Sequence, residues 1–261
     1  MKLEIANICK DFTTTSGKLL PVLQDINLSI NKEEFVALVG PSGCGKSTLL
    51  NITAGLLEPT SGNVKFTDVA AGYEPLMSIV FQETGLFPWR NVHDNIAFGL
   101  ETAGMKADEK EARIKHYIEL VGLKGFEKSF PHQLSGGMRQ RVGIARALAI
   151  EPDLLLMDEP FSALDAQTRT IMQEELVTLW EKTRLTTLYV THNIQEAVML
   201  ADRVVLLSRR PGKVSKILQI TIPRAERAKP EHTDEIAEFV RIIWEHISKD
   251  ARAALMEVED N

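Results

Sequence analysis

The chain has 261 residues, of which 44% are hydrophobic and 25% are charged, and its formal net charge is -6. This length fits one large domain, or one domain with a sizeable insertion. The acidic balance gives no electrostatic reason to expect a nucleic-acid partner. The first residues lack the apolar core of a signal peptide, and no apolar run approaches the roughly 20 residues that span a bilayer. We therefore expect a cytoplasmic protein with no membrane span of its own.

Short apolar runs predict most of the strands. Residues 3–12 and 22–30 alternate between apolar and polar side chains, which indicates antiparallel strands with one covered face. Later runs are apolar almost throughout and predict strands covered on both faces, at 35–40, 78–82, 154–160, 186–192 and 203–208. Helical patterns separate several of these runs, so the sequence predicts an α/β domain with a mostly parallel central sheet.

Helices are predicted in two further regions. Between about residues 83 and 150 strand signals are weak, and 107–122 has a helical apolar face, with Asp108 and Glu111 placed as in a capping box. This region predicts an inserted helical subdomain. A polar, proline-containing stretch then leads to an amphipathic helix at 233–249. We expect this helix to pack on its own domain, with contact to a second subunit as the alternative.

A glycine-rich loop, GPSGCGKST at 40–48, joins a predicted strand to a predicted helix. Its glycines allow successive backbone N–H groups to point at phosphate oxygens. Lys46 would neutralise the β- and γ-phosphates, and the Ser47 hydroxyl would bind Mg²⁺. A plain glycine turn is the alternative, but the order of strand, loop and helix disfavours it. The predicted phosphate-binding residues are Gly40, Pro41, Ser42, Gly43, Cys44, Gly45, Lys46, Ser47 and Thr48.

Polar side chains end three of the predicted strands, at Asp158 with Glu159, at His192 and at Gln82. Open parallel sheets bind ligands at the carboxyl ends of their strands. Asp158 would hold Mg²⁺, commonly through water, and Glu159 would orient and deprotonate the attacking water. His192 would contact the γ-phosphate, and Gln82 would reach Mg²⁺ or the water. Solvated acids and a structural histidine are the alternatives for these positions.

A second phosphate cradle is predicted at LSGGMRQR, residues 134–141. Ser135 can cap the helix that follows, and Gly136 and Gly137 allow a phosphate to approach closely. An ordinary glycine-assisted helix start is the alternative. Because the loop at 40–48 would already hold the phosphates of one nucleotide, the second cradle has no obvious use within a single chain.

Together these motifs resemble the nucleotide-binding subunit of an ABC transporter. In chain order they match Walker A (40–48), the Q-loop (Gln82), the signature (134–138), Walker B (154–159), the D-loop (162–165) and the switch histidine (His192). The resemblance covers about residues 1–220. It implies a P-loop NTPase (ABC ATPase) core, an N-terminal antiparallel β-subdomain and a helical signature subdomain at about 83–150. Residues 221–261 would form a C-terminal helical tail.

The resemblance also implies a reaction and partners. The ligand would be Mg·ATP, the reaction ATP hydrolysis, and the assembly two such subunits on a membrane-embedded pair. Ser135 would then serve the ATP held by the other subunit, and Asp165 would cross to that subunit. A helix N-cap is the alternative for Asp165. Glu159 corresponds to the general base of the family and His192 to its phosphate sensor.

Aromatic residues correspond to two further family sites. Phe12 matches the ring that stacks on adenine, with packing under the first sheet as the alternative. Phe87, Pro88 and Trp89 resemble the surface that grips a coupling helix of the permease, with a core position as the alternative. Flanking sequence is most similar to ATPases of nitrate, sulfonate and taurine importers. The expected partners are a second copy or a homologous ATPase subunit, permease subunits and, indirectly, a solute-binding protein. A soluble ABC ATPase unconnected with transport is the competing function.

Overall fold

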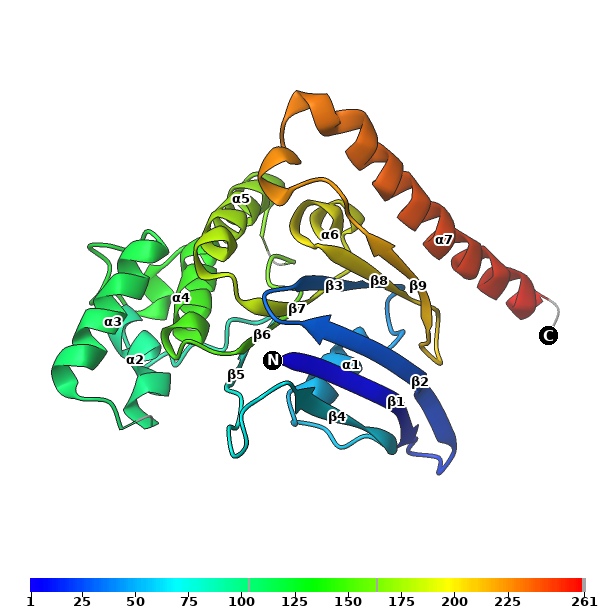
Figure 1. The fold of residues 1–261 in the computed structure, drawn as a ribbon, viewed down its shortest axis with the longest axis horizontal. Helices are drawn as coiled ribbons and strands as arrows, with labels where there is room; N and C mark the ends of the chain where they lie inside the picture. Colours follow the sequence, from blue (N-terminus) through cyan, green and yellow to red (C-terminus); the bar gives the residue numbers. More distant parts are fainter. Residues whose placement is uncertain (103, 163, 260–261) are drawn as a thin grey trace. The chain divides into compact units, whose positions relative to one another are not determined.

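The computed structural model describes residues 1–102, 104–162 and 164–259 (Figure 1). The chain forms two compact units, and each is described by itself. Residues 1–73 and 186–261 form the phosphate-loop unit, and residues 74–185 form the helical unit. Within the described ranges, no helix is both long enough and apolar enough to cross a membrane.

The phosphate-loop unit contains a three-stranded antiparallel sheet in the order β2-β1-β4. Its strands are β1 (Lys2–Thr13), β2 (Leu19–Asn31) and β4 (Ser61–Thr67), which lie side by side in Figure 1. One face is buried through residues such as Leu3 and Ile5 on β1 and Ile30 on β2. The alternation seen in the sequence therefore correctly predicts the first two strands. It misses β4, because that strand is mostly polar and only partly buried.

The same unit contains four strands in the order β7-β3-β8-β9. The strands are β3 (Phe35–Val39), β7 (Thr186–Thr191), β8 (Arg203–Leu207) and β9 (Val214–Gln219). β3 is parallel to both β7 and β8, and β9 is antiparallel to β8. Every residue of β3 and β7 is buried, as a strand covered on both faces requires. The mostly parallel sheet is thus confirmed.

Helices of the phosphate-loop unit are α1 (Lys46–Thr53), α6 (Ile194–Leu200) and α7 (Thr233–Glu259), with short 3₁₀ turns at Arg224–Glu226 and Pro230–His232. α7 packs against α6, and its His246 Nε2 lies 2.9 Å from Ser215 Oγ on β9. The predicted end of this helix at 249 is wrong, because the helix continues to Glu259 through alanine, leucine, methionine and glutamate, which favour helix. Residues 260–261 of the predicted tail lie outside the described residues.

The helical unit is built on two parallel strands, β5 (Met77–Val80) and β6 (Leu154–Asp158). Its helices are α2 (Val92–Thr102), α3 (Ala107–Leu120), α4 (Gly136–Ala149) and α5 (Ala166–Thr183), with a 3₁₀ turn at Pro131–Gln133. The capping box predicted from Asp108 and Glu111 is wrong. α3 begins one residue before Asp108, and Glu111 pairs with another helix instead.

That partner is His93 on α2, whose ring links α2 to α3. Its Nδ1 lies 2.9 Å from Asp94 Oδ1, and its Nε2 lies 2.9 Å from Glu111 Oε2. Burial lowers the pKa of His93, but the hydrogen bonds and charges of Asp94 and Glu111 outweigh it, so the net pKa is raised. A raised folded-state pKa adds stability below the unfolded pKa, and this stability is lost as the pH rises through the folded pKa.

His93→Gln should therefore lower the free energy of unfolding most near pH 6, and the difference from wild type should shrink by about pH 9. Urea unfolding of both proteins across this range measures the effect. His116→Gln, at an exposed position of α3, serves as the control. A His93→Gln difference that stays constant across the range would contradict the assigned coupling.

Candidate nucleotide-binding site

The loop at 40–48 leaves β3 and enters α1 through glycines in left-handed conformations. Gly43 has φ 74°, and Gly45, the N-cap of α1, has φ 108°. A Cβ atom on Gly45 would lie 2.6 Å from Leu23 Cδ2, so any other residue there would require the buried Leu23 side chain to move. The first N–H groups of α1 have no acceptor within the helix. The loop therefore has the form of an anion-binding helix start.

Lys46 occupies the first turn of α1 and is only 6% exposed. Its Nζ donates to the carbonyl oxygens of Gly40 at 2.9 Å and Pro41 at 3.1 Å. These bonds hold the ammonium inside the loop, where it can neutralise a bound phosphate. Cys44 is buried beside Gly40, and burial raises the pKa of its thiol. This cysteine therefore packs as a small apolar side chain.

His192 follows β7, the strand next to β3. Val39 and Thr191 are paired in the two strands, so the glycine loop and His192 leave the sheet at the same edge. Around His192, the Thr191 hydroxyl accepts from Asn193 N at 3.0 Å and donates to Glu196. Asn193 caps α6 by accepting from Glu196 N at 3.1 Å. These bonds fix the turn that carries the histidine, and the spacing of Asn193 and Glu196 could have revealed that cap in the sequence.

Phe12 lies near the end of β1 and is 39% exposed. Lys10 Nζ is 5.1 Å from its ring centroid. The ring is thus partly exposed. Stacking on adenine stays a prediction.

In the helical unit, β5 and β6 are neighbours, Gln82 follows β5, and the acidic pair Asp158 and Glu159 lies at the end of β6. β5 ends at Val80, so the predicted strand to Gln82 is two residues too long and Gln82 lies in an exposed loop. Asp158 ends β6, and Glu159 has φ 44°. Such backbone is costly for a residue with a side chain and persists only where its surroundings hold it. Here the Glu159 carbonyl accepts from Ser162 N at 3.1 Å and Ser162 Oγ at 2.9 Å.

The D-loop ends in a helix cap. Asp165 Oδ1 accepts from Gln167 N at 3.1 Å and Thr168 N at 3.0 Å, and its Oδ2 accepts from Thr168 Oγ1 at 2.7 Å. These bonds, those of Thr168 first, lower the pKa of Asp165. The N-cap interpretation is therefore confirmed, and contact with a second subunit stays a prediction. Ala163, within the same motif, lies outside the described residues.

The signature motif opens α4. Ser135 is its N-cap, and Ser135 Oγ accepts from Met138 N at 3.2 Å. A Cβ atom on Gly137 would lie 3.0 Å from Thr168 Cγ2, so this turn approaches the start of α5 closely. The N-cap that the sequence predicts at Ser135 is confirmed. Binding of a phosphate at this helix start stays a prediction.

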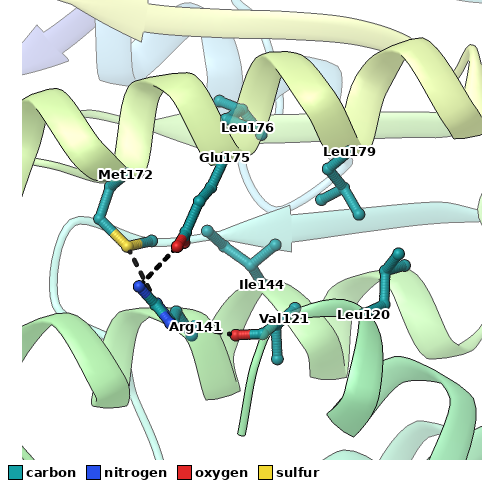
Figure 2. Close-up of a pocket in the computed structure, with 8 residues that line it drawn as sticks. All are labelled: Leu120, Val121, Arg141, Ile144, Met172, Glu175, Leu176 and Leu179. Carbon is teal, nitrogen blue, oxygen red and sulfur yellow. Dashed lines mark hydrogen bonds and ion pairs between the residues drawn. The ribbon is translucent and has the colours of Figure 1, made fainter.

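Further along α4, Arg141 holds this helix to its neighbours. Its Nη2 lies 2.6 Å from Glu175 Oε1 on α5, and its Nη1 donates to Val121 O at 3.4 Å (Figure 2). The cavity beside it, about 30 Å³ and lined mainly by apolar side chains, is too small for a nucleotide. This region therefore supports the signature helix and does not hold the nucleotide.

Phe87, Pro88 and Trp89 lie in the loop before α2. Trp89 is 71% exposed, which excludes a core position for its ring. The Phe87 ring centroid is 4.7 Å from that of Phe98 and 5.6 Å from that of Trp89. Sequence reasoning missed Asn95, which is fully buried and fixes the loop. Its Oδ1 accepts from Phe87 N at 2.9 Å, and its Nδ2 donates to Arg90 O at 2.8 Å.

Comparisons with known proteins agree with these motifs. The family model described as ABC transporter matches residues 23–162. An uncharacterized ABC transporter ATP-binding protein of Methanocaldococcus jannaschii is 45% identical over 95% of this chain and 94% of its own length. The taurine import ATP-binding protein TauB of Yersinia pestis is 50% identical over 77% of this chain and 79% of its own. TauB of Rhizobium johnstonii is 43% identical over 93% and 96%.

Among solved structures, an ATP-binding cassette in a dimeric post-hydrolysis state, bound to ADP and Pi, matches with a TM-score of 0.73. It is 31% identical to this chain, and the match covers 85% of this chain and 100% of that one. The family match, the relatives and the phosphate-binding loop lead to one conclusion. The chain belongs to the ABC transporter family, and it is an ATP-binding subunit that hydrolyses ATP.

Proposed function

We propose that this chain is the energy-coupling ATPase of an importer, located on the cytoplasmic face of the membrane, and that it drives uptake of a small solute of the taurine, sulfonate or nitrate type. The observation that supports the proposal is the glycine loop at 40–48 together with the capped helix start at Ser135, in a chain up to 50% identical to proteins named for taurine import. Two copies of this chain, or this chain and a homologous ATPase subunit, would act on permease subunits. A solute-binding protein would deliver the solute to the permease.

In this proposal the loop at 40–48 binds the ATP phosphates, with Lys46 neutralising the β- and γ-phosphates and Phe12 stacking on adenine. The hydroxyl of Ser47, the amide of Gln82 and the carboxylate of Asp158 are oxygen donors of the kind that Mg²⁺ prefers. When bound, Mg²⁺ would neutralise charge on the β- and γ-phosphates. Asp158 would hold the Mg²⁺ ion through a water molecule.

For hydrolysis, Glu159 takes a proton from the attacking water. The water oxygen forms a bond to the γ-phosphorus, and the bond from that phosphorus to the β–γ bridging oxygen breaks, which yields ADP and inorganic phosphate. His192 contacts the γ-phosphate, and Gln82 positions the water or the metal. The second cradle, Ser135 with Gly136 and Gly137, would bind the γ-phosphate of the ATP held by the other subunit, and Asp165 would contact that subunit.

The permease contact is tested with two exposed tryptophans. Trp89→Ala should abolish co-purification of membrane subunits from detergent-solubilised membranes, because it removes the most exposed large apolar side chain of the segment Phe87–Trp89. ATP binding to the isolated chain should not change. Trp244→Ala, on α7 and 61% exposed, is the matched control and should retain the subunits.

Retention of membrane subunits by Trp89→Ala would remove Trp89 from this contact. Recovery of the wild-type chain only in a soluble complex would instead favour an ABC ATPase unconnected with transport. Uptake of labelled taurine, sulfonate and nitrate into proteoliposomes that contain the co-purified subunits would then identify the solute.

A further inference from the structure

Arg146, in the last turn of α4, is bonded to the loop that follows Gln82. Its Nη2 donates to Thr84 O at 2.9 Å, and its Nη1 donates to Gly85 O at 2.9 Å. The two terminal nitrogens of one guanidinium therefore donate to two successive backbone carbonyls. A lysine offers a single ammonium and cannot reproduce this fork. The residues joined here lie 61 and 62 positions apart in the chain, all within the helical unit.

Two further contacts bring the same loop against α4. A Cβ atom on Gly143, one turn before Arg146, would lie 3.7 Å from Thr84 O, so the helix backbone itself approaches the loop. The Arg146 Cζ lies 5.8 Å from the ring centroid of Phe87, within the range of a cation–π contact. Residues 84–89, called the partner segment here, thus contact α4 in three ways. The backbones lie close together, the Arg146 guanidinium donates hydrogen bonds, and the same guanidinium lies over the Phe87 ring.

The other end of α4 is the signature turn at Ser135. A helix of 14 residues is about 20 Å long, and its hydrogen bonds keep it straight and stiff. Arg141 joins the middle of α4 to α5 through Glu175 (Figure 2). The partner segment and the signature turn are therefore attached to opposite ends of one rigid helix.

We propose that Arg146 is a positioning residue that clamps the partner segment to α4, so that residues 84–89 and the signature turn move as one body when ATP joins two subunits. A movement of Ser135 would thereby be transmitted to a permease that binds Phe87–Trp89. The transmission part of this proposal rests on the proposed role of Ser135 at the ATP of the other subunit. The clamp itself does not.

Hydrogen exchange followed by mass spectrometry tests both parts on the full chain. In the monomer without nucleotide, Arg146→Lys should speed amide exchange in 84–89 about tenfold and leave 134–138 unchanged, because only the clamp opens. Phe87→Leu, which removes the ring but keeps an apolar side chain, should have a smaller effect in the same direction. Arg113→Lys, on α3 and paired with Glu109 and Glu151, is the matched control.

In the Glu159→Gln background, ATP should protect 134–138 and 84–89 together, and Arg146→Lys should abolish the protection of 84–89 alone. Equal exchange of 84–89 in folded Arg146→Lys and wild-type monomers would overturn the clamp, and Phe87→Leu decides if Arg146→Lys does not fold. Equal ATP-induced protection of 84–89 with and without Arg146 would overturn the transmission. Absence of any ATP dimer in the parent would count against the proposed function instead, while the monomer experiment still decides the clamp.

Discussion

Glu159→Gln is expected to slow ATP turnover at least about 100-fold while ATP still binds, because the amide cannot accept the proton of the attacking water. The substitution keeps the size of the side chain and leaves the backbone bonds between Glu159 and Ser162 in place. The loss should therefore fall on kcat. Steady-state phosphate release and binding of a fluorescent ATP analogue measure the two quantities separately.

Glu174→Gln is the matched control, since it makes the same change at an exposed position of α5. It should hydrolyse ATP at the wild-type rate. Near-normal hydrolysis by Glu159→Gln would remove Glu159 from the role of general base. Loss of ATP binding in that variant would instead indicate that the carboxylate is needed to build the site.

Local sequence patterns correctly predict the strands and the loop whose structure depends on residues adjacent in the chain. β3 and β7 are buried throughout, so their apolar runs identify them. The glycine loop is equally local, because each glycine serves the turn in which it stands. The edge strands β4 and β9 were missed, since polar, partly exposed strands carry a weak signal.

Contacts between distant residues escaped sequence reasoning. Glu111 reads as a capping residue of α3, yet its carboxylate reaches His93 on α2. The bond from Arg146 to Thr84 crosses 62 positions and leaves no periodic trace. Likewise, the left-handed backbone of Glu159 is set by Ser162 and by the strand before it, not by a residue type that favours such a conformation.

Ser135→Arg is expected to abolish ATP-driven dimerisation and hydrolysis while the isolated chain still binds ATP at the loop 40–48. Ser135 is exposed at the start of α4, where its hydroxyl caps the helix. An arginine there removes the cap and places a long side chain where a phosphate of the other subunit would approach. Size-exclusion chromatography with light scattering, in the Glu159→Gln background with ATP, measures the dimer directly.

Ser135→Ala separates the two consequences of that change. It removes the cap acceptor, which costs the helix about 1 kcal/mol, but it leaves the approach to the helix start open. The alanine variant should therefore have a lower melting temperature than wild type. It should still form the ATP dimer, although more weakly. A Ser135→Arg protein that forms the dimer as well as its parent would show that the second cradle does not meet the nucleotide of another subunit. Loss of the dimer in the arginine variant alone would assign this exposed helix start to the ATP of a second subunit, because the alanine variant lacks the same cap.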